Sequence, residues 1–491
     1  MKNVHAFKEE YYAPNNMAIC LSGDIEPAET FKLIKEQWAD MEPNKDLNED
    51  RDHGKAEPIN GPVTKTVQGP ESERVYIGYR FPANDTAEQM VALIDELLYN
   101  GQAGLIDLNL VKEQKVLDGG CYSRFYREYG QLRFYGQARQ DQELDEVKSL
   151  LLDQVEKIKN GDFPDWMMDA VIRNKKKERI ENRSSNWKAF AFTNAFIKSE
   201  PWAKSVNYVE QLDQIKKKEL VQFAKQHLDK DRVVVYKRHG EDTSAVEVPK
   251  PPISSVDINR SKKSEFRKQI EKIETKPIEP KFINYDKRIS EKTLDNGLKL
   301  NYIENKENEL FNLYYIVDIG RKHDKKLSLA MEYLEKLGTD RYSPSELEEE
   351  FYKLAADFRV SAGGKRSYVT VEGLKANFTE TVKLLEHMLK HAKADTAAHR
   401  KMVDNTIQER KNRKKSKWAN MSGLFSYGIY GANSGFSDKI PSDELRTINP
   451  QKLVNKIHNL YQYDHYMLYY GTREMNEVEQ KLPAFMRYPK T

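Results

Sequence analysis

The 491-residue sequence contains only two cysteines, Cys20 and Cys121. Two thiols are too few for a disulfide framework in a chain of this length, and they exclude a cysteine-rich zinc module. No segment approaches the run of about 18 apolar residues that a transmembrane helix needs. The first residues, MKNVHAFKEEYY, lack the apolar core of a secretory signal. We therefore expect no membrane insertion.

An excess of charge of one sign is also missing. The chain has 80 Lys and Arg against 77 Asp and Glu, a net charge of +3. A balance this even argues against a protein that binds nucleic acid through bulk charge. Hydrophobic residues make up 38% and aromatic residues 10%, which is enough to build cores and excludes global disorder. At about 150 residues per domain, the length predicts about three domains.

Internal similarity is the most informative feature that is present. Segments 7–23, 220–240 and 453–471 each run from an amphipathic stretch through a polar corner to a short apolar strand pattern near a glycine. Similar series of strand and helix patterns precede the second and third segments. The sequence therefore predicts two whole units, at 54–240 and 289–491, in the order strand, helix, strands, three helices, strand. A turn at Asp295, Asn296 and Gly297 opens the second unit.

The remaining parts are a linker and an incomplete unit. Residues 241–288 contain PKPP and KPIEP, which stiffen a linker, with a short helix predicted in SKKSEFRKQIEKI between them. Residues 1–53 hold only the tail of a first unit, including a strand at 17–22 that must pair to satisfy its backbone groups. We expect this strand to pair with a separate polypeptide, or the chain to be a fragment of a longer one.

The stretch LAMEYLEKLGT at 329–339 resembles the active-site helix of the M16 (insulinase/pitrilysin) metallopeptidases. Their zinc motif is H-x-x-E-H, followed by an LGT-like turn. Register on that turn places Leu329 at the first His, Glu332 at the catalytic Glu and Tyr333 at the second His. Glu409 stands where the family has its third ligand, roughly 75 residues further on. The tail YYAPNNMAICLSGDIEP also resembles the family's unit endings, so the resemblance covers the whole chain.

The resemblance implies an α+β fold of repeated M16-type units, each a mostly antiparallel sheet with helices on one face. The resemblance does not imply that this chain is catalytic. A catalytic zinc needs three protein ligands and an open position for water. Leu329 has no lone pair, neutral Tyr333 is a poor ligand, and Glu409 alone cannot hold the ion. We therefore expect these positions and Glu332 to be vestigial, with no catalytic residue and no metal ligand in this chain.

The corresponding helix of the first whole unit, MVALIDELLYNG, offers Ala92, Asp95 and Glu96 and no histidine. The resemblance thus implies a non-catalytic portion of an M16-type zinc metallopeptidase. This portion would form the peptide-binding chamber wall for a missing unit that holds the zinc cofactor. The alternative is a stand-alone inactive scaffold or partner subunit of an active peptidase.

The expected partners follow from the same resemblance. They are unfolded peptides or the missing M16 units, and not nucleic acid. The compartment would be the periplasm if a missing N-terminal part carried an export signal, and the cytoplasm otherwise. The substrate and the oligomeric state are not encoded in any recognisable pattern.

Two further patterns have competing interpretations. His387 and His391 are four residues apart and would face one side of a helix, but Met388 replaces the Glu of a metalloprotease H-E-x-x-H motif. The pattern favours a solvent-facing pair over an enzyme that recruits a distant third ligand.

The run RKNRKKSK at 410–417 is the strongest basic cluster. It suits an acidic partner or nucleic acid, or alternatively the exposed C-terminal end of a long helix. The similar run NKKKERIENR in the first whole unit favours a repeated architectural feature.

Overall fold

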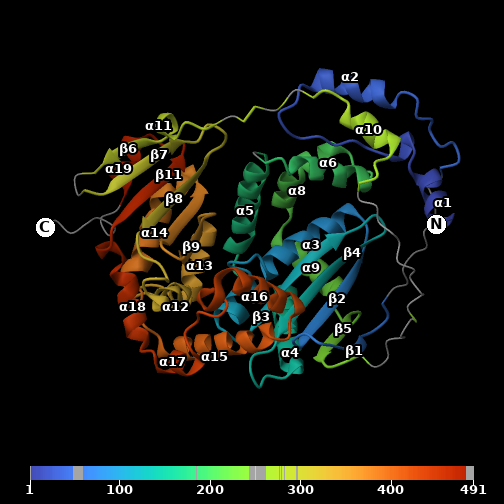
Figure 1. Ribbon diagram of the computed structural model, residues 1–491. Helices are drawn as coiled ribbons and strands as arrows, with labels where there is room; N and C mark the ends of the chain where they lie inside the picture. The colour runs from blue at the N-terminus through green and yellow to red at the C-terminus, as the bar shows by residue number, and fades with distance from the viewer. Residues whose placement is uncertain are drawn as a thin grey trace.

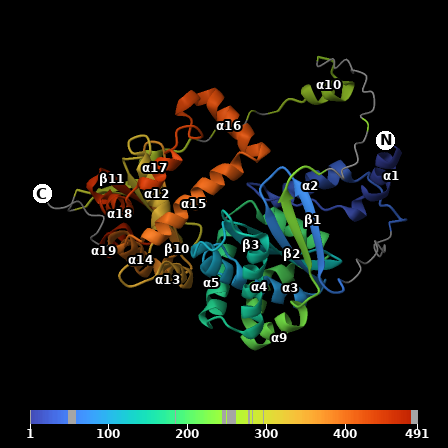
Figure 2. The ribbon, with the colours of Figure 1, turned by 90° about the horizontal axis from the view of Figure 1, so that it is seen from below.

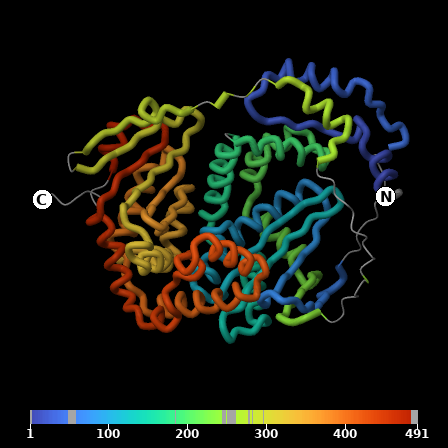
Figure 3. The backbone as a smooth tube through the Cα atoms, viewed as in Figure 1, coloured from blue at the N-terminus to red at the C-terminus, as the bar shows by residue number. Residues whose placement is uncertain are grey.

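The computed structural model describes residues 2–47, 59–183, 185–242, 249, 261–275, 277, 279–280, 282–294 and 297–482. Two sheets with their helices lie beside one another (Figures 1 and 3). We call residues 59–242 the first-sheet region and residues 282–482 the second-sheet region.

The first sheet has five strands in the order β1-β5-β2-β4-β3. All neighbours are antiparallel except β1 and β5, which pair in parallel with Val63 opposite Val233. The strands are β1 (Val63–Gly69), β2 (Arg74–Pro82), β3 (Asp118–Phe125), β4 (Tyr129–Gln137) and β5 (Val233–His239). The helices are α3 (Asp85–Leu98), the π-helix η2 (Asp107–Lys112), α4 (Leu144–Asn160), α5 (Trp166–Arg183), α6 (Lys188–Ile197), α7 (Trp202–Val206), α8 (Tyr208–Gln214) and α9 (Lys217–His227).

The second sheet has six strands in the order β6-β7-β11-β8-β10-β9, again with one parallel pair, β7 and β11. The strands are β6 (Ser290–Thr293), β7 (Lys299–Glu304), β8 (Leu310–Val317), β9 (Asp357–Ala362), β10 (Ser367–Leu374) and β11 (His465–Gly471). The helices are α12 (Lys325–Leu334), α13 (Pro344–Lys353), η3 (Lys375–Asn377), α14 (Phe378–His391), α15 (Thr396–Arg413), α16 (Lys417–Tyr430), η4 (Gly431–Asn433), α17 (Ser442–Thr447), α18 (Pro450–His458), η5 (Leu460–Gln462) and α19 (Met475–Lys481).

Each sheet buries one face under its helices. Along β2 the side chains of Val75, Ile77, Tyr79 and Phe81 are buried, whereas Tyr76 between them is exposed. This alternation follows from the two-residue period of a strand, which sends successive side chains to opposite faces. The predicted α+β class, with mostly antiparallel sheets and helices on one face, is therefore confirmed.

Local sequence signals begin the helices that cover the sheets. The Asn84 side chain accepts the N–H of Ala87 and caps α3. Ser343 and Glu346 form a reciprocal capping box at the start of α13, where Pro344 occupies the first turn. These side chains satisfy backbone donors that have no partner inside the helix.

The N-terminal tail forms α1 (Lys2–Tyr11), the 3-10 helix η1 (Pro14–Asn16) and α2 (Pro27–Trp38). Residues 17–22 pair with no strand in the described part of the chain. The strand expected there needs a partner from outside this sequence for its backbone groups, so it stays a prediction. Met17, Ile19 and Leu21 are exposed at alternate positions.

The linker helix is confirmed, as α10 (Glu265–Glu271), and a short α11 (Tyr285–Arg288) follows it. The predicted turn residues Asp295 and Asn296 lie outside the described residues, as does most of PKPP. None of the described helices is both long and apolar enough to cross a membrane.

The two regions contact each other directly. Tyr352 at the end of α13 is 3% exposed and belongs to the hydrophobic core of the first-sheet region. Its backbone carbonyl accepts a hydrogen bond from Asn174 Nδ2 at 2.9 Å. The Tyr352 hydroxyl is buried without a hydrogen-bond partner among the described residues. The aromatic ring, and not the hydroxyl, therefore joins the two regions.

Replacing Tyr352 with alanine should lower the free energy of unfolding by about 3–5 kcal/mol, because the cavity opens between two packed regions. Tyr352→Phe is the matched control. It removes a hydroxyl that has no partner, so stability should stay the same or rise by about 1 kcal/mol. Urea denaturation of both variants provides the measurement, and a large loss in the Phe variant would contradict this role for the ring.

Candidate functional site

Helix α12 carries the positions that resemble a zinc motif. Asp324 caps the helix by accepting the N–H of Lys326 at 2.9 Å. The LGT turn follows, where the N–H of Thr339 donates to the Tyr342 carbonyl at 2.8 Å. A Cβ on Gly338 would lie 2.6 Å from that same carbonyl oxygen, so only glycine fits there. Backbone packing by itself therefore explains why Gly338 stands in this turn, without any catalytic role.

Two of the four motif positions are packed inside the protein. Leu329 is 6% exposed and Tyr333 is fully buried. The Tyr333 hydroxyl donates to the Asp395 carbonyl at 2.6 Å and accepts the Asp395 N–H at 2.8 Å. Its ring stands edge-on to His399, with centroids 5.4 Å apart. Burial raises the pKa of Tyr333 to about 12, so the phenol stays protonated near neutral pH.

The two carboxylates of the motif, Glu332 and Glu409, are exposed. Glu332 lines a hollow of about 160 Å³ together with Leu329, Thr406 and Arg410. Loss of hydration in these concave surroundings raises the pKa of Glu332, and the like charge of Glu409 raises it further. The pKa of Glu409 is also raised, first by desolvation and then by Asp118 of the first sheet.

The four positions therefore do not converge on one ion. Leu329 and Tyr333 are buried, whereas the Glu332 and Glu409 side chains are exposed. Within the described ranges, no group of three or more His, Cys, Asp and Glu residues could hold a metal ion. Zinc does not fit these residues, because zinc needs lone pairs that an alkyl side chain and a doubly hydrogen-bonded phenol do not offer.

The histidine pair on α14 is only partly as predicted. His391 is 39% exposed, but the side chain of His387 is 14% exposed and its Nε2 lies 3.0 Å from Thr339 Oγ1. The two rings stack with centroids 4.7 Å apart, and both approach Asp340. Burial, followed by the neighbouring His391, lowers the pKa of His387. This contact holds the LGT turn against α14, and the described residues supply no third metal ligand there.

The matching helix of the first-sheet region uses its carboxylates for structure. Asp95 accepts the N–H of Ser123 at 2.6 Å, and Glu96 pairs with Lys175 at 2.5 Å. Burial is the first cause that raises the pKa of both carboxyls.

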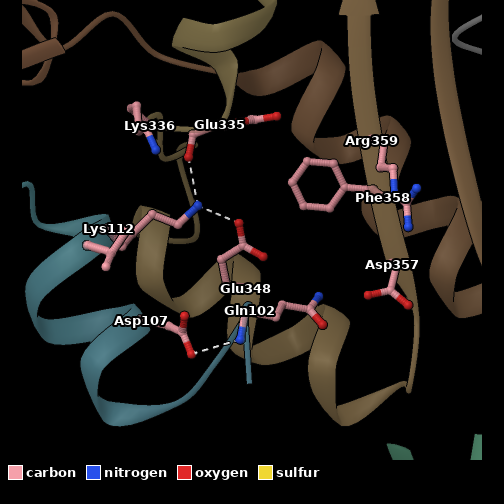
Figure 4. Close-up of a pocket in the computed structure, with 11 residues that line it drawn as sticks. Gln102, Asp107, Lys112, Glu335, Lys336, Glu348, Asp357, Phe358 and Arg359 are labelled. Atoms are coloured by element: carbon pink, nitrogen blue, oxygen red, sulfur yellow. Dashed lines mark hydrogen bonds and ion pairs between the residues drawn. The ribbon is translucent and has the colours of Figure 1, made fainter. Parts of the chain in front are cut away.

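Sequence patterns did not reveal a polar cavity between the two regions. It has a volume of about 360 Å³ and lies between η2 on one side and α12, α13 and β9 on the other (Figure 4). Lys112 spans it, donating to the Glu335 carbonyl at 2.7 Å and pairing with Glu348. Gln102 donates to the Ala356 carbonyl at 3.1 Å. These partners are more than 200 residues apart in sequence, so no local signal could identify them.

Asp107 supports the cavity wall from the first-sheet side. One of its carboxylate oxygens accepts the N–H groups of Asn100, Gly101 and Gly104 at 2.9, 3.2 and 3.0 Å. Burial raises the pKa of Asp107 to about 7, outweighing these donors, which lower it. The side chain therefore shapes the loop before η2 and titrates near neutrality.

Replacing Asp107 with asparagine should change how stability depends on pH. The folded pKa lies above the ordinary value near 3.9, so folding takes up a proton between about pH 4 and 7. The wild type should gain stability relative to D107N as pH falls through that window, by up to about 4 kcal/mol. Urea unfolding at pH 4.5, 6 and 8 would measure the difference, and a constant difference would contradict a titrating Asp107.

Replacing Tyr333 with phenylalanine should destabilise the chain by about 1–3 kcal/mol, because it leaves both backbone groups of Asp395 without their partner. Tyr352→Phe again provides the comparison, since it removes a buried hydroxyl that has no partner. Equal thermal stability of the two variants would contradict the anchoring role of the Tyr333 hydroxyl.

Comparison with known proteins gives matches to M16 peptidases and zinc proteases. Residues 1–175 match the sequence model described as the peptidase M16 inactive domain. The zinc protease PqqE of Helicobacter pylori is 23% identical over 236 residues, which cover 46% of this chain and 52% of that protein. The alignment thus spans about half the length of this curated relative.

Several solved structures are also similar. A mutant of the ferredoxin protease FusC, in complex with Arabidopsis ferredoxin, gives a TM-score of 0.46 at 14% identity, over 99% of this chain and 57% of that one. The periplasmic protease PqqL from Escherichia coli gives 0.40 at 14% identity, over 100% and 57%. A Helicobacter pylori protease gives 0.45 at 19% identity, over 48% and 59%.

The family that the sequence motifs suggested is confirmed by the match at residues 1–175 and by the zinc-protease relative. Residues 1–175 therefore carry a domain similar to the inactive domain of the M16 peptidases.

Proposed function

We propose that this chain supplies non-catalytic units of an M16 zinc peptidase and forms part of the wall of its peptide chamber. The observation that carries the proposal is the burial of Leu329 and Tyr333, the two positions where a catalytic unit has histidines. Zinc and the activated water would belong to another M16 unit. The unit boundaries proposed are 1–53 for the tail of an incomplete unit, 54–240 and 289–491 for two inactive units, and 241–288 for the linker.

The N-terminal tail supports an association with another M16 unit. Met17, Ile19 and Leu21 alternate on an exposed segment, and the φ and ψ of Met17 are −127° and 146°, an extended conformation. Its neighbours already hold it in place, since Asn15 and Asn44 exchange hydrogen bonds through side chain and backbone. Such a segment has the apolar side and the backbone groups that an incomplete sheet requires.

Edge strands are the proposed contacts for peptide. Among the described strands, β3 pairs only with β4 and β9 only with β10, so each offers one unpaired edge. An extended peptide can add to such an edge through main-chain hydrogen bonds. Phe358 and Arg359 of β9 also line the cavity between the regions, where their side chains would meet a peptide's side chains.

The same tail observation favours a second candidate, a separate inactive partner subunit of an active peptidase. Both candidates require pairing with a zinc-bearing M16 unit, and they differ only in whether that unit is encoded in the same polypeptide. The reading frame preceding Met1 distinguishes them, since an in-frame H-x-x-E-H motif there would indicate one enzyme.

Association through the tail is testable with paired substitutions. The double change Ala18→Pro and Cys20→Pro removes two backbone N–H donors from the segment. We expect it to weaken binding to a zinc-bearing M16 unit at least about tenfold, the equivalent of about 1.4 kcal/mol. Ala18→Ser with Cys20→Ser keeps both donors and should bind as the wild type does. Size-exclusion chromatography of mixtures and peptide hydrolysis by the complex are the measurements.

Two results would contradict the proposal. Equal binding by the proline and serine variants would exclude strand pairing. Stoichiometric zinc in the isolated chain, together with chelator-sensitive peptide hydrolysis, would exclude a non-catalytic role.

A further inference from the structure

A basic groove lies at the C-terminal end of α15 and adjoins the hollow lined by Glu332, with which it shares Arg410 and Lys439. It has a volume of about 560 Å³. Six cationic residues line it: Arg410, Lys411, Arg413, Lys414, Lys439 and Arg446. No carboxylate lines it among the described residues. Gln140 of the first-sheet region completes the lining and accepts a hydrogen bond from Lys411 at 3.3 Å.

Two carboxylates near the groove are paired with cations of α12. Asp438 pairs with Lys325, and Glu444 pairs with Lys326 at 3.0 Å. Arg413 and Lys414 line the groove without a close ion pair among the described residues, although the charge of Arg413 acts on Glu409 of the same helix. Burial, followed by the charges of Arg413 and Arg410, lowers the pKa of Lys439, which is the effect expected of crowded cations.

Phe436 lines the groove and also contacts α16, a helix with exposed apolar side chains. Arg413 and Lys439 lie over the ring of Phe436, 5.0 and 4.8 Å from its centroid. The other contact of this ring is Gly423 on α16, where a Cβ would come within 2.7 Å of it. Glycine therefore lets α16 pack closely against Phe436. The Phe436 ring thus contacts both the helix and the cations of the groove.

Helix α16 presents large apolar side chains to solvent, and it stands away from both sheets (Figure 2). Leu424 is 68% exposed and Ile429 is 70% exposed. The other exposed members are Trp418, Met421, Phe425, Tyr427 and Tyr430. Exposed apolar surface of this kind, adjoining uncompensated positive charge, is typical of a binding surface.

We propose that the groove and α16 together bind an acidic, extended peptide segment whose aliphatic or aromatic residues alternate with or adjoin its carboxylates. Six cations spread along the groove exceed what one small anion could contact. They could instead pair with several carboxylates placed along a peptide. The exposed aliphatic side chains of α16, Leu424 and Ile429, match apolar peptide side chains, and the near-neutral net charge of the chain argues against nucleic acid. The proposal specifies the peptide chemistry of the chamber wall and so rests on the proposed function.

Fluorescence anisotropy with the full chain tests this proposal. The probe is a labelled short peptide of alternating Glu and Leu, compared with peptides that carry Lys in place of Glu or Ser in place of Leu. The wild type should bind the Glu-Leu peptide most tightly, and added salt should weaken the binding because the charges are exposed. Equal binding of all three peptides would overturn the proposal.

Matched variants locate the surface. Arg413→Gln, Lys414→Gln and Arg446→Gln together should weaken binding about tenfold, and Leu424→Ser with Ile429→Ser should do the same. Lys218→Gln, Lys225→Gln and Lys230→Gln remove the same charge from exposed positions around α9 and should have no effect. Circular dichroism confirms folding, and a groove variant that is folded and binds normally would overturn the proposal.

Competition distinguishes other partners. An oligonucleotide or anionic vesicles that displace the peptide at lower concentration than unlabelled peptide would overturn the assignment to a peptide. The isolated chain suffices for these measurements. Failure of the tail to capture a zinc-bearing unit would therefore count against the proposed function and leave the peptide result intact.

Discussion

The hydrogen-bond pair between the Tyr333 hydroxyl and the backbone of Asp395 links the two helices on which an M16 zinc site would depend. Asp395 is also the N-cap of α15, where its side chain accepts the N–H groups of Ala397 and Ala398. One residue thus begins α15 and receives the buried end of α12. A position that would hold a ligand in a catalytic unit has become a packing contact, which explains how the helix keeps its geometry without a metal.

The contact between Tyr333 and Asp395 also fixes where the rest of α15 lies. Tyr333 holds the start of the helix. Further along, the helix carries Glu409 near enough to Glu332 to raise its pKa, and its basic end meets Gln140 of the first-sheet region. The carboxylate and the cations of this helix therefore lie in different environments. Glu409 lies near Asp118 of the first sheet, whereas the cations gather around Phe436.

Contact between the two regions combines an apolar anchor with a polar cavity. The Tyr352 ring is buried in the first-sheet core, and the nearby Lys112 spans water-accessible space to reach Glu348. An aromatic ring stabilises such a contact mainly through the area it removes from water. The polar groups around it add geometric specificity, because each must meet its partner when buried.

Much of the fold and part of the candidate site could be predicted from sequence. The alternation in β2 and the capping residues of α3 and α13 are local, since they arise from strand period and helix ends. The chemistry of Leu329 argued against a zinc ligand at that position before any coordinates, because an alkyl group has no lone pair. The strand at 17–22 stays a prediction, since strand formation depends on a partner that the local pattern places outside this sequence.

Tertiary structure alone decided the rest. The partner of the Tyr333 hydroxyl, the placement of Tyr352 in the neighbouring core and the pKa of Asp107 all depend on residues distant in sequence or on burial. The basic run was visible in sequence, but its groove required α15, α17 and Gln140 to meet. Periodicity and residue chemistry are properties of neighbouring residues, whereas charge compensation and burial are set by packing between segments far apart in the chain.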